Sequence, residues 1–140
     1  MKLNETTNAL LEKRFGKDSL MALATCVNNI PPVRTVDACY QDGAFYVITY
    51  ALSGKMQQIS LNPCVALSGE WFTAQGIGEN MGYVGKPENN EIVQWLKEQF
   101  AAWINNGHTN FQDENTVLLK IRLTSGVLFA DGTRYEIDFT

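Results

Sequence analysis

The spacing of hydrophobic and polar residues along this chain predicts mostly β-strands. Runs that are apolar, or that alternate with period two, are typical of strands with one or both faces covered. These runs are residues 20–27, 33–40, 44–50, 64–78, 81–85 and 116–139. We expect 64–78 to be one long or bent strand. Asp42-Gly43 and Asp131-Gly132 are hairpin turn signals, so the strands are expected to pair antiparallel.

Three segments instead carry apolar residues at helical spacing. We expect helices at 4–15, over about two turns within 53–63, and at 88–104. Ser53 is a suitable N-cap for the second of them. Because strands and helices do not alternate along the chain, a doubly wound parallel fold is disfavoured. The pattern predicts a mainly β (α+β) protein: a six- to eight-stranded antiparallel barrel in one domain of residues 1–140, with helices at its ends and edges.

Composition excludes several classes of function. The formal net charge is −4, which argues against nucleic acid as a partner because binding to a phosphate backbone requires a basic surface. No apolar run reaches the roughly 20 residues of a membrane span, so we expect no membrane partner. The first residues lack the basic start and apolar centre of a signal peptide, so a cytoplasmic protein is expected.

The cysteines do not suggest a metal site. There are three of them, Cys26, Cys39 and Cys64, and no two are spaced as a CxxC pair. An odd number without such spacing predicts neither metal ligation nor a disulfide framework. We expect all three to be buried in strands as small hydrophobic side chains.

The stretch from Pro32 to Pro63 has the residue types that a phosphate requires. It contains two cations, Arg34 and Lys55, and three hydroxyl groups, those of Thr35, Thr49 and Ser53. A two-residue turn after the strand of Arg34 would fold the next strand back, so that Arg34 lies near Thr49. Arginine, lysine and hydroxyl donors beside a helix start suit a phosphate monoester. The alternative is a solvated edge, with Ser53 as an ordinary helix cap.

The same stretch, with its flanks, resembles the FMN-binding split-barrel family related to pyridoxamine 5′-phosphate oxidase. The resemblance depends on the order and spacing of many short pieces, and it extends weakly over essentially the whole chain. The pieces are Leu23-Ala24-Thr25, Pro32, Arg34-Thr35-Val36, Asp42-Gly43, Phe45-Tyr46-Val47, Thr49, Ser53, Lys55, Gln58-Ile59, Asn62-Pro63 and Val65-Ala66.

This resemblance implies a flavin site with named residues. Arg34 and Lys55 would bind the FMN phosphate, with Ser53 or Thr49 as hydroxyl partners. The flavin would lie in a groove between the two subunits of a homodimer. The remaining implied contacts are the backbone of Arg34, Thr35 and Val36 at the isoalloxazine edge, Ile48 and Thr49 in the same pocket, Gln58 as a further polar contact, and Trp71 from the second subunit.

The resemblance also implies a class of reaction. We expect a flavin-dependent oxidoreductase that acts on a small molecule. The family's oxidase has a basic residue where this chain has Gly54, so the specific vitamin reaction is not implied. The alternatives are a flavin- or haem-binding module without turnover and a deazaflavin-dependent reductase. No catalytic residue can be named, and His108, the only histidine, is expected to be a loop residue.

Overall fold

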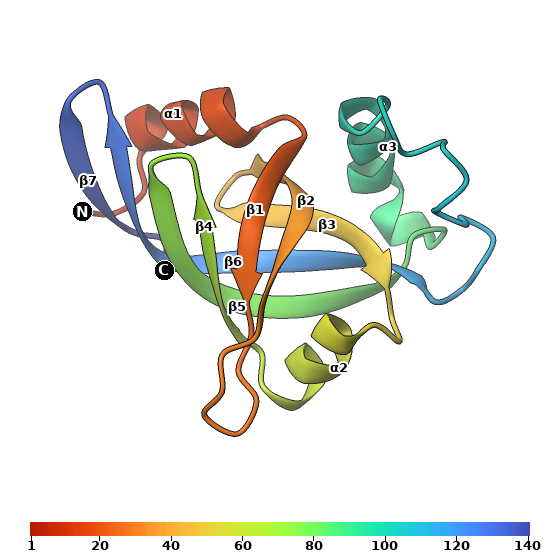
Figure 1. The fold of residues 1–140 in the computed structure, drawn as a ribbon. Helices are drawn as coiled ribbons and strands as arrows, with labels where there is room; N and C mark the ends of the chain where they lie inside the picture. Colours follow the sequence, from red (N-terminus) through yellow and green to blue (C-terminus); the bar gives the residue numbers. More distant parts are fainter.

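The computed structural model describes residues 1–140, and its main feature is one antiparallel sheet that curls into a barrel (Figure 1). Three α-helices and one short 3-10 helix accompany the strands. The strands are β1 (Ser19–Ala24), β2 (Val33–Gln41), β3 (Ala44–Tyr50), β4 (Cys64–Gly69), β5 (Phe72–Tyr83), β6 (Thr116–Ala130) and β7 (Thr133–Asp138). The helices are α1 (Glu5–Phe15), α2 (Gly54–Leu61), η1 (Pro87–Asn89) and α3 (Asn90–Gln99).

The barrel has six strands and one additional strand. The sheet order is β3-β2-β1-β4-β5-β6-β7, and a second pairing of β3 with β6 closes the first six strands into a ring. All seven pairings between strands are antiparallel. The long strand β6 both closes the ring and holds the additional strand, because one half of it pairs with β3 and the other half with β7. The predicted mainly β antiparallel barrel is confirmed.

Two hydrophobic clusters hold the molecule together. The larger one fills the barrel and includes three aromatic rings, Phe15, Phe45 and Phe72, whose centroids lie 5.6–6.3 Å apart. Helix α1 covers one end of the barrel and contributes Leu11 and Phe15 to this cluster (Figure 1). Burial of one such side chain contributes roughly 1.5–3 kcal/mol to folding. The smaller cluster joins α3 and the turn after it to the outer face of β2 and β6.

The prediction of one strand over 64–78 is wrong. β4 and β5 form a hairpin whose turn is Glu70 and Trp71, and β5 then continues to Tyr83, which includes most of the short strand predicted at 81–85. Trp71 has a backbone φ of +51°, a conformation that bulky residues adopt rarely. Neither turn residue is Gly, Asn or Asp, the residues by which a hairpin turn is usually predicted. The expected irregularity in this strand is present as a register shift between Gln75 and Gly76.

The helix predicted at 88–104 is shorter. It begins as the 3-10 turn η1 and ends at Gln99, and a series of turns follows. The apolar residues after Gln99 stay buried all the same, because Phe100 and Ile104 pack into the smaller cluster. Phe100 and Ile104 are apolar because they are buried, and this extended the helical pattern past the true end of α3. No helix of the structure is long and apolar enough to cross a bilayer.

The expectation for the cysteines is confirmed for only one of them. Cys39 is completely buried, whereas Cys26 and Cys64 are exposed and free. Cys26 lies just beyond the end of β1, because the strand ends three residues earlier than its apolar run suggested. Cys64 is the first residue of β4, at the start of an outward-facing set of side chains.

Candidate anion-binding site

Strands β2 and β3 separate soon after their hairpin turn. Gln41 pairs with Ala44 and Tyr40 with Phe45, as predicted, and Cys39 with Tyr46 is the last recorded pair. Beyond it, β2 stays paired with β1 while β3 pairs with β6. The expectation that the hairpin itself brings Arg34 beside Thr49 is therefore wrong. Closure of the barrel draws β3 away, and α2 follows β3 at this open end (Figure 1).

Arg34 is held in place by two side chains at this open end. Its Nη1 donates to the hydroxyl of Thr25 at 2.8 Å and to the carbonyl of Leu23 at 3.4 Å, and its Nη2 donates to Oε1 of Gln58 at 2.7 Å. Thr25 in turn donates to the same Gln58 oxygen at 2.6 Å. Gln58 belongs to α2, so this network fixes the helix to β1 and β2 and orients the guanidinium.

Lys55 and Ser53 lie at the start of α2. The Lys55 ammonium donates to the hydroxyl of Thr49 at 2.8 Å. Its pKa is lowered, first by burial and then by the positive charge of Arg34, so the two cations are close enough to repel. Ser53 occupies the N-cap position, but its side chain makes no capping hydrogen bond. Its Oγ is buried and has no partner at all, so the prediction that it serves as an ordinary cap is wrong.

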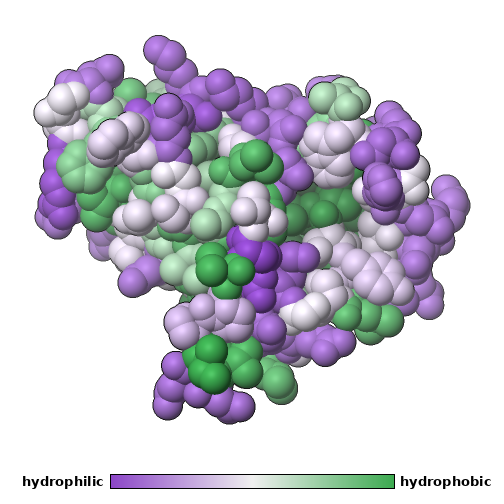
Figure 2. Space-filling view, in the orientation of Figure 1, coloured by the Kyte–Doolittle hydropathy of each residue, from purple (hydrophilic) through white to green (hydrophobic).

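The charges at this corner are not balanced within the chain. The three salt bridges of the structure join Lys2 to Asp138, Arg122 to Glu79 and Arg134 to Glu136, all on other parts of the surface. Arg34 and Lys55 therefore have no carboxylate partner, and burial lowers the pKa of Arg34 as well. Figure 2 shows a hydrophilic patch beside α2 on a face that is otherwise mixed. Two cations, a free hydroxyl and a helix start together favour an anion.

The structure brings most of the predicted side chains together. One hydrogen bond joins Arg34 to Gln58 and another joins Lys55 to Thr49, and the charge of Arg34 lowers the pKa of Lys55. Ser53 lies two residues before Lys55, at the start of α2. The side chain of Thr35 is exposed and that of Val36 is buried in the core, and neither makes a hydrogen bond to these residues. Thr49 also lines, together with Ile48, a polar cavity of 310 Å³ whose lining includes His108.

Trp71 is the predicted contact that this chain does not bring to the cluster. It lies in the turn between β4 and β5, at the end of that hairpin away from α2, and 71% of it is exposed. Its ring meets that of Phe129 edge-on, with centroids 6.2 Å apart. Within one chain, Trp71 is therefore an exposed aromatic residue.

Sequence reasoning missed Thr25 as a site residue. It ends an apolar run, and its side chain continues the inward-facing positions of Met21 and Leu23, so it is 1% exposed. A hydroxyl at a buried position needs a hydrogen-bond partner, so a threonine at an inward-facing strand position could have indicated a polar contact. Its partners are the Arg34 and Gln58 side chains described above.

A second polar cluster on β2 was also missed, and it is acidic. Asp18 accepts a hydrogen bond from Nε1 of Trp103 at 3.0 Å, while its other oxygen is buried without a partner. The pKa of Asp37 is raised to about 6, first by burial and then by a hydrogen bond to Asp18 and by its charge. Burial and these two acids raise the pKa of the Cys39 thiol to about 12. The acids are far apart in sequence, so no local pattern could pair them.

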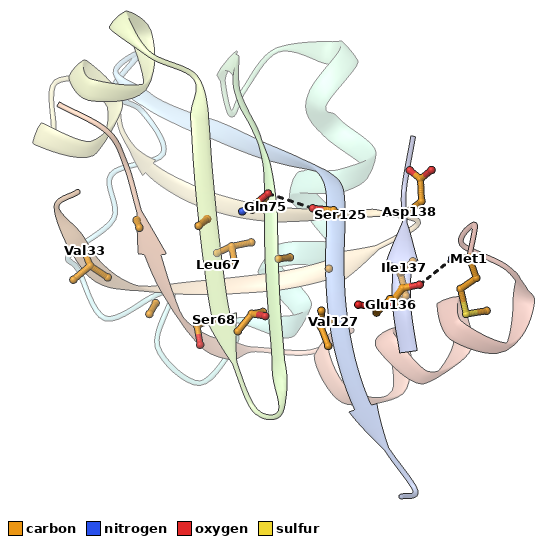
Figure 3. A pocket seen from close by; sticks show the side chains of 16 residues that line it. Met1, Val33, Leu67, Ser68, Gln75, Ser125, Val127, Glu136, Ile137 and Asp138 are labelled. Atoms are coloured by element: carbon orange, nitrogen blue, oxygen red, sulfur yellow. Dashed lines mark hydrogen bonds between the residues drawn. The ribbon is translucent and has the colours of Figure 1, made fainter. Parts of the chain in front are cut away.

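The outer face of the barrel carries a shallow groove of 610 Å³ (Figure 3). It runs across β1, β4, β5, β6 and β7, and small side chains make up much of its floor. Val33, the neighbour of Arg34, lies at one edge. Gln75 and Ser125 are joined across it by a hydrogen bond of 3.4 Å. The other lining residues are Met1, Ala22, Ala24, Ala66, Leu67, Ser68, Thr73, Ala74, Gly126, Val127, Glu136, Ile137 and Asp138.

Comparison with known proteins places this barrel in a family. No protein-family model matches the chain. A curated protein of Anaplasma phagocytophilum (strain HZ), named pyridoxine/pyridoxamine 5′-phosphate oxidase, is 31% identical over 119 residues. The match covers 79% of this chain and 57% of that protein. The chain belongs to the pyridoxamine 5′-phosphate oxidase-related split-barrel family. It spans little more than half the length of this relative.

Solved structures show the same split-barrel fold across nearly the whole chain. General Stress Protein 26 of Bacillus anthracis is 17% identical with a TM-score of 0.68, and the match covers 93% of this chain and 98% of that one. An FAD-binding protein of Mesorhizobium loti is 13% identical with a TM-score of 0.67, covering 89% and 92%. A heme binding protein of Mycobacterium smegmatis is 12% identical with a TM-score of 0.71, covering 99% and 60%. At such identities these likenesses establish the fold alone.

Proposed function

We propose that this split-barrel protein binds FMN through its phosphate at the corner of Arg34 and Lys55, and that it is a flavin-dependent oxidoreductase for a small molecule. One observation carries the proposal: the buried Ser53 hydroxyl has no partner, and it lies at the same helix start as Lys55, which like Arg34 has no carboxylate partner. A buried polar group without a partner costs about 1–3 kcal/mol. A bound phosphate oxygen would remove that cost.

The donors at this corner suit a phosphate. Arg34 has five N–H donors, of which three are engaged by Thr25, Leu23 and Gln58, so two remain. Lys55 uses one of its three N–H donors on Thr49, which leaves two. The Ser53 hydroxyl and the first N–H groups of α2 add uncharged donors. A phosphate monoester has three terminal oxygens that accept such bonds.

Backbone groups of β2 would face the flavin ring. Thr25 donates its N–H to the carbonyl of Pro32 at 3.0 Å, so in antiparallel alternation the even residues of β2 face β1. The odd residues, Thr35 among them, present their N–H and C=O groups to the gap that β3 leaves. A bound flavin supplies the redox chemistry. The chain's part is to hold the phosphate, to orient the ring and to place N–H donors where negative charge collects.

A second copy of the chain belongs to this proposal. The groove on the outer face is lined mainly by small and apolar residues on an open sheet surface, which suits close approach of another sheet. A second copy docked there would bring its own exposed Trp71 to this subunit's open corner. The relative's name, which is that of an oxidase acting on a phosphate ester, and the FAD-binding neighbour support a flavin and a small-molecule substrate.

The visible absorption spectrum of the purified protein tests the proposal. We expect the two-banded spectrum of a bound flavin, or its appearance when FMN is added to colourless protein. Bleaching of that spectrum by NADH or NADPH, followed by recovery with an electron acceptor, would support an oxidoreductase. A Soret band would instead indicate haem, and a protein that ignores added FMN would contradict the proposal.

A further inference from the structure

Two exposed thiols lie at the ends of neighbouring strands, next to the corner described above. Cys26 follows the end of β1, and Cys64 begins β4. The two strands are adjacent in the sheet (Figure 1). The third cysteine, Cys39, is fully buried, so it serves as an internal reference for thiol reactivity.

The register of the two strands, if continued beyond their last pair, would place these thiols opposite each other. β1 pairs with β4 through Ala22 with Ser68, Leu23 with Leu67, and Ala24 with Ala66. In an antiparallel pair, a step of two residues forward on one strand is matched by two residues back on the other. The observed pairs end at Ala24 with Ala66, and one such step beyond them would place Cys26 opposite Cys64.

Both thiols also belong to the same face of the sheet. Leu23 and Thr25 of the first segment are buried, so the residues between and after them point outward. On β4, Val65 and Leu67 are buried, which turns Cys64 outward. The two cysteines therefore continue the outward-facing rows that line the groove of Figure 3.

The backbone on either side of the thiols is held by hydrogen bonds. Thr25 donates its N–H to the carbonyl of Pro32 at 3.0 Å, which keeps the end of β1 extended. Cys64 donates its N–H to Oδ1 of Asn62 at 3.1 Å, and it pairs with Ile77 of β5. Directly opposed antiparallel residues have Cα atoms about 4.5–5.5 Å apart, within the range of about 4.4–6.8 Å that a disulfide requires.

We propose that Cys26 and Cys64 form a reversible intramolecular disulfide when the protein meets a hydroperoxide. One thiolate attacks an oxygen of the peroxide, so that the O–O bond breaks, the cysteine sulfur becomes a sulfenic acid, and the other oxygen takes up a proton and leaves as water. The second thiol then attacks that sulfur and releases a second water. In total, two thiols and one hydrogen peroxide give one disulfide and two waters, so the sulfurs are oxidised and the peroxide is reduced.

The bridge would connect the two segments that position Arg34. Cys26 directly follows Thr25, and Cys64 lies a few residues beyond Gln58 at the end of α2. Thr25 and Gln58 are the two side chains that hold the guanidinium. The disulfide would thus fix the loop after β1 to the end of α2, on the outer side of this network.

Mass spectrometry of the full chain tests the thiol pair. The protein is purified with a reductant, freed of it, treated with an equal amount of hydrogen peroxide and alkylated without denaturation. We expect alkylated thiols to fall from two to none, the intact mass to fall by two hydrogen atoms, and a digest to contain the Cys26–Cys64 peptide pair. Dithiothreitol should restore both thiols.

Matched variants make the result specific. Cys39→Ala should form the bridge as the wild type does, whereas Cys26→Ser and Cys64→Ser should each leave one thiol that is oxidised only singly. Thiols that remain alkylatable, stepwise over-oxidation of each, or a disulfide between two chains on a non-reducing gel would each overturn the proposal. The experiment needs no flavin, so its outcome is independent of the proposed FMN site.

Discussion

Strand β2 carries two polar clusters of opposite charge, three residues apart and on opposite faces. At Arg34, two cations lie together without a carboxylate, and the buried hydroxyl of Ser53, at the same helix start as Lys55, has no partner. At Asp37, two carboxyl groups lie together without a cation. Like charges in close contact repel in both clusters, but only the acids can remove that repulsion by taking up a proton.

This difference supports the proposal that the basic cluster binds a ligand, whereas the acidic cluster can satisfy its own hydrogen bonds within the chain. A proton on Asp37 gives the buried oxygen of Asp18 the donor that it otherwise lacks, and Trp103 supplies a donor to the second oxygen. Lysine and arginine keep their protons at neutral pH, so the basic cluster cannot relieve its repulsion by a change of protonation. The unused N–H donors of Arg34 and Lys55 at the open corner therefore favour binding of an external anion.

Removal of both cations should have the largest effect. In the Arg34→Ala, Lys55→Ala double variant, we expect FMN binding to weaken by about 1.5–3 kcal/mol for each charged contact, which is roughly 10²–10⁴-fold in total. Quenching of flavin fluorescence during a titration measures it. The matched control is the Lys2→Ala, Arg134→Ala variant, which loses the same charge from exposed ion pairs and should bind FMN like the wild type. Equal affinities for the two variants would exclude a phosphate at this corner.

Loss of the acidic pair should change how the free energy of unfolding depends on pH. The pKa of Asp37 is raised to about 6 from an ordinary value of 3.8, so its proton is bound more tightly in the folded state. This stabilisation is complete below the ordinary value and is lost as pH rises through 6. We expect the free energy of unfolding to fall by about 1 kcal/mol between pH 5 and 7, after allowance for solvent screening.

The Asp37→Asn variant should lose that pH dependence, because its amide cannot titrate. Urea unfolding at each pH, followed by tryptophan fluorescence, measures it, since Trp103 contacts Asp18. The control is Asp131→Asn, in the exposed turn between β6 and β7, which should keep the wild-type dependence. A wild-type profile that is flat between pH 5 and 7 would show that the two acids do not share a proton.

Removal of the unpaired Ser53 hydroxyl should have a smaller effect on FMN binding than removal of the two cations. In Ser53→Ala, we expect FMN binding to weaken by about 0.5–1.5 kcal/mol, because one neutral donor is lost. The free energy of unfolding without ligand should stay the same or rise slightly, since no hydrogen bond of the free protein is broken. Ser60→Ala, on the exposed side of α2, is the control for a serine change in this helix. A Ser53→Ala protein with lower stability and unchanged FMN affinity would show that Ser53 is a structural residue.

A gain of affinity is expected at Gly54. A β-carbon there would meet only Nε2 of Gln58, at 3.9 Å, and the residue is exposed at the first position of α2. Gly54→Arg should thus be tolerated and should tighten FMN binding several-fold by adding a third cation. Gly54→Ala is the control for the backbone change. If both variants bind alike, the start of α2 does not face the phosphate.

The sequence predicts the strands of the barrel well and the site in part. Alternating residues and the two Asp-Gly turns are local signals, and they place β2, β3 and β7 closely. The turn at Trp71 has no such signal, so the hairpin of β4 and β5 was missed. The Arg34–Gln58–Thr25 network depends on barrel closure and on the placement of α2, which are properties of the whole fold.

The central claim is that the corner of Arg34, Ser53 and Lys55 binds the phosphate of FMN, and a comparison of FMN with riboflavin tests it most directly. Riboflavin has the same ring without the phosphate. By isothermal calorimetry, we predict that FMN binds the wild-type protein at least about 100-fold more tightly than riboflavin, and that the difference disappears in the Arg34→Ala, Lys55→Ala variant. Equal affinity of the wild type for FMN and riboflavin would contradict the claim.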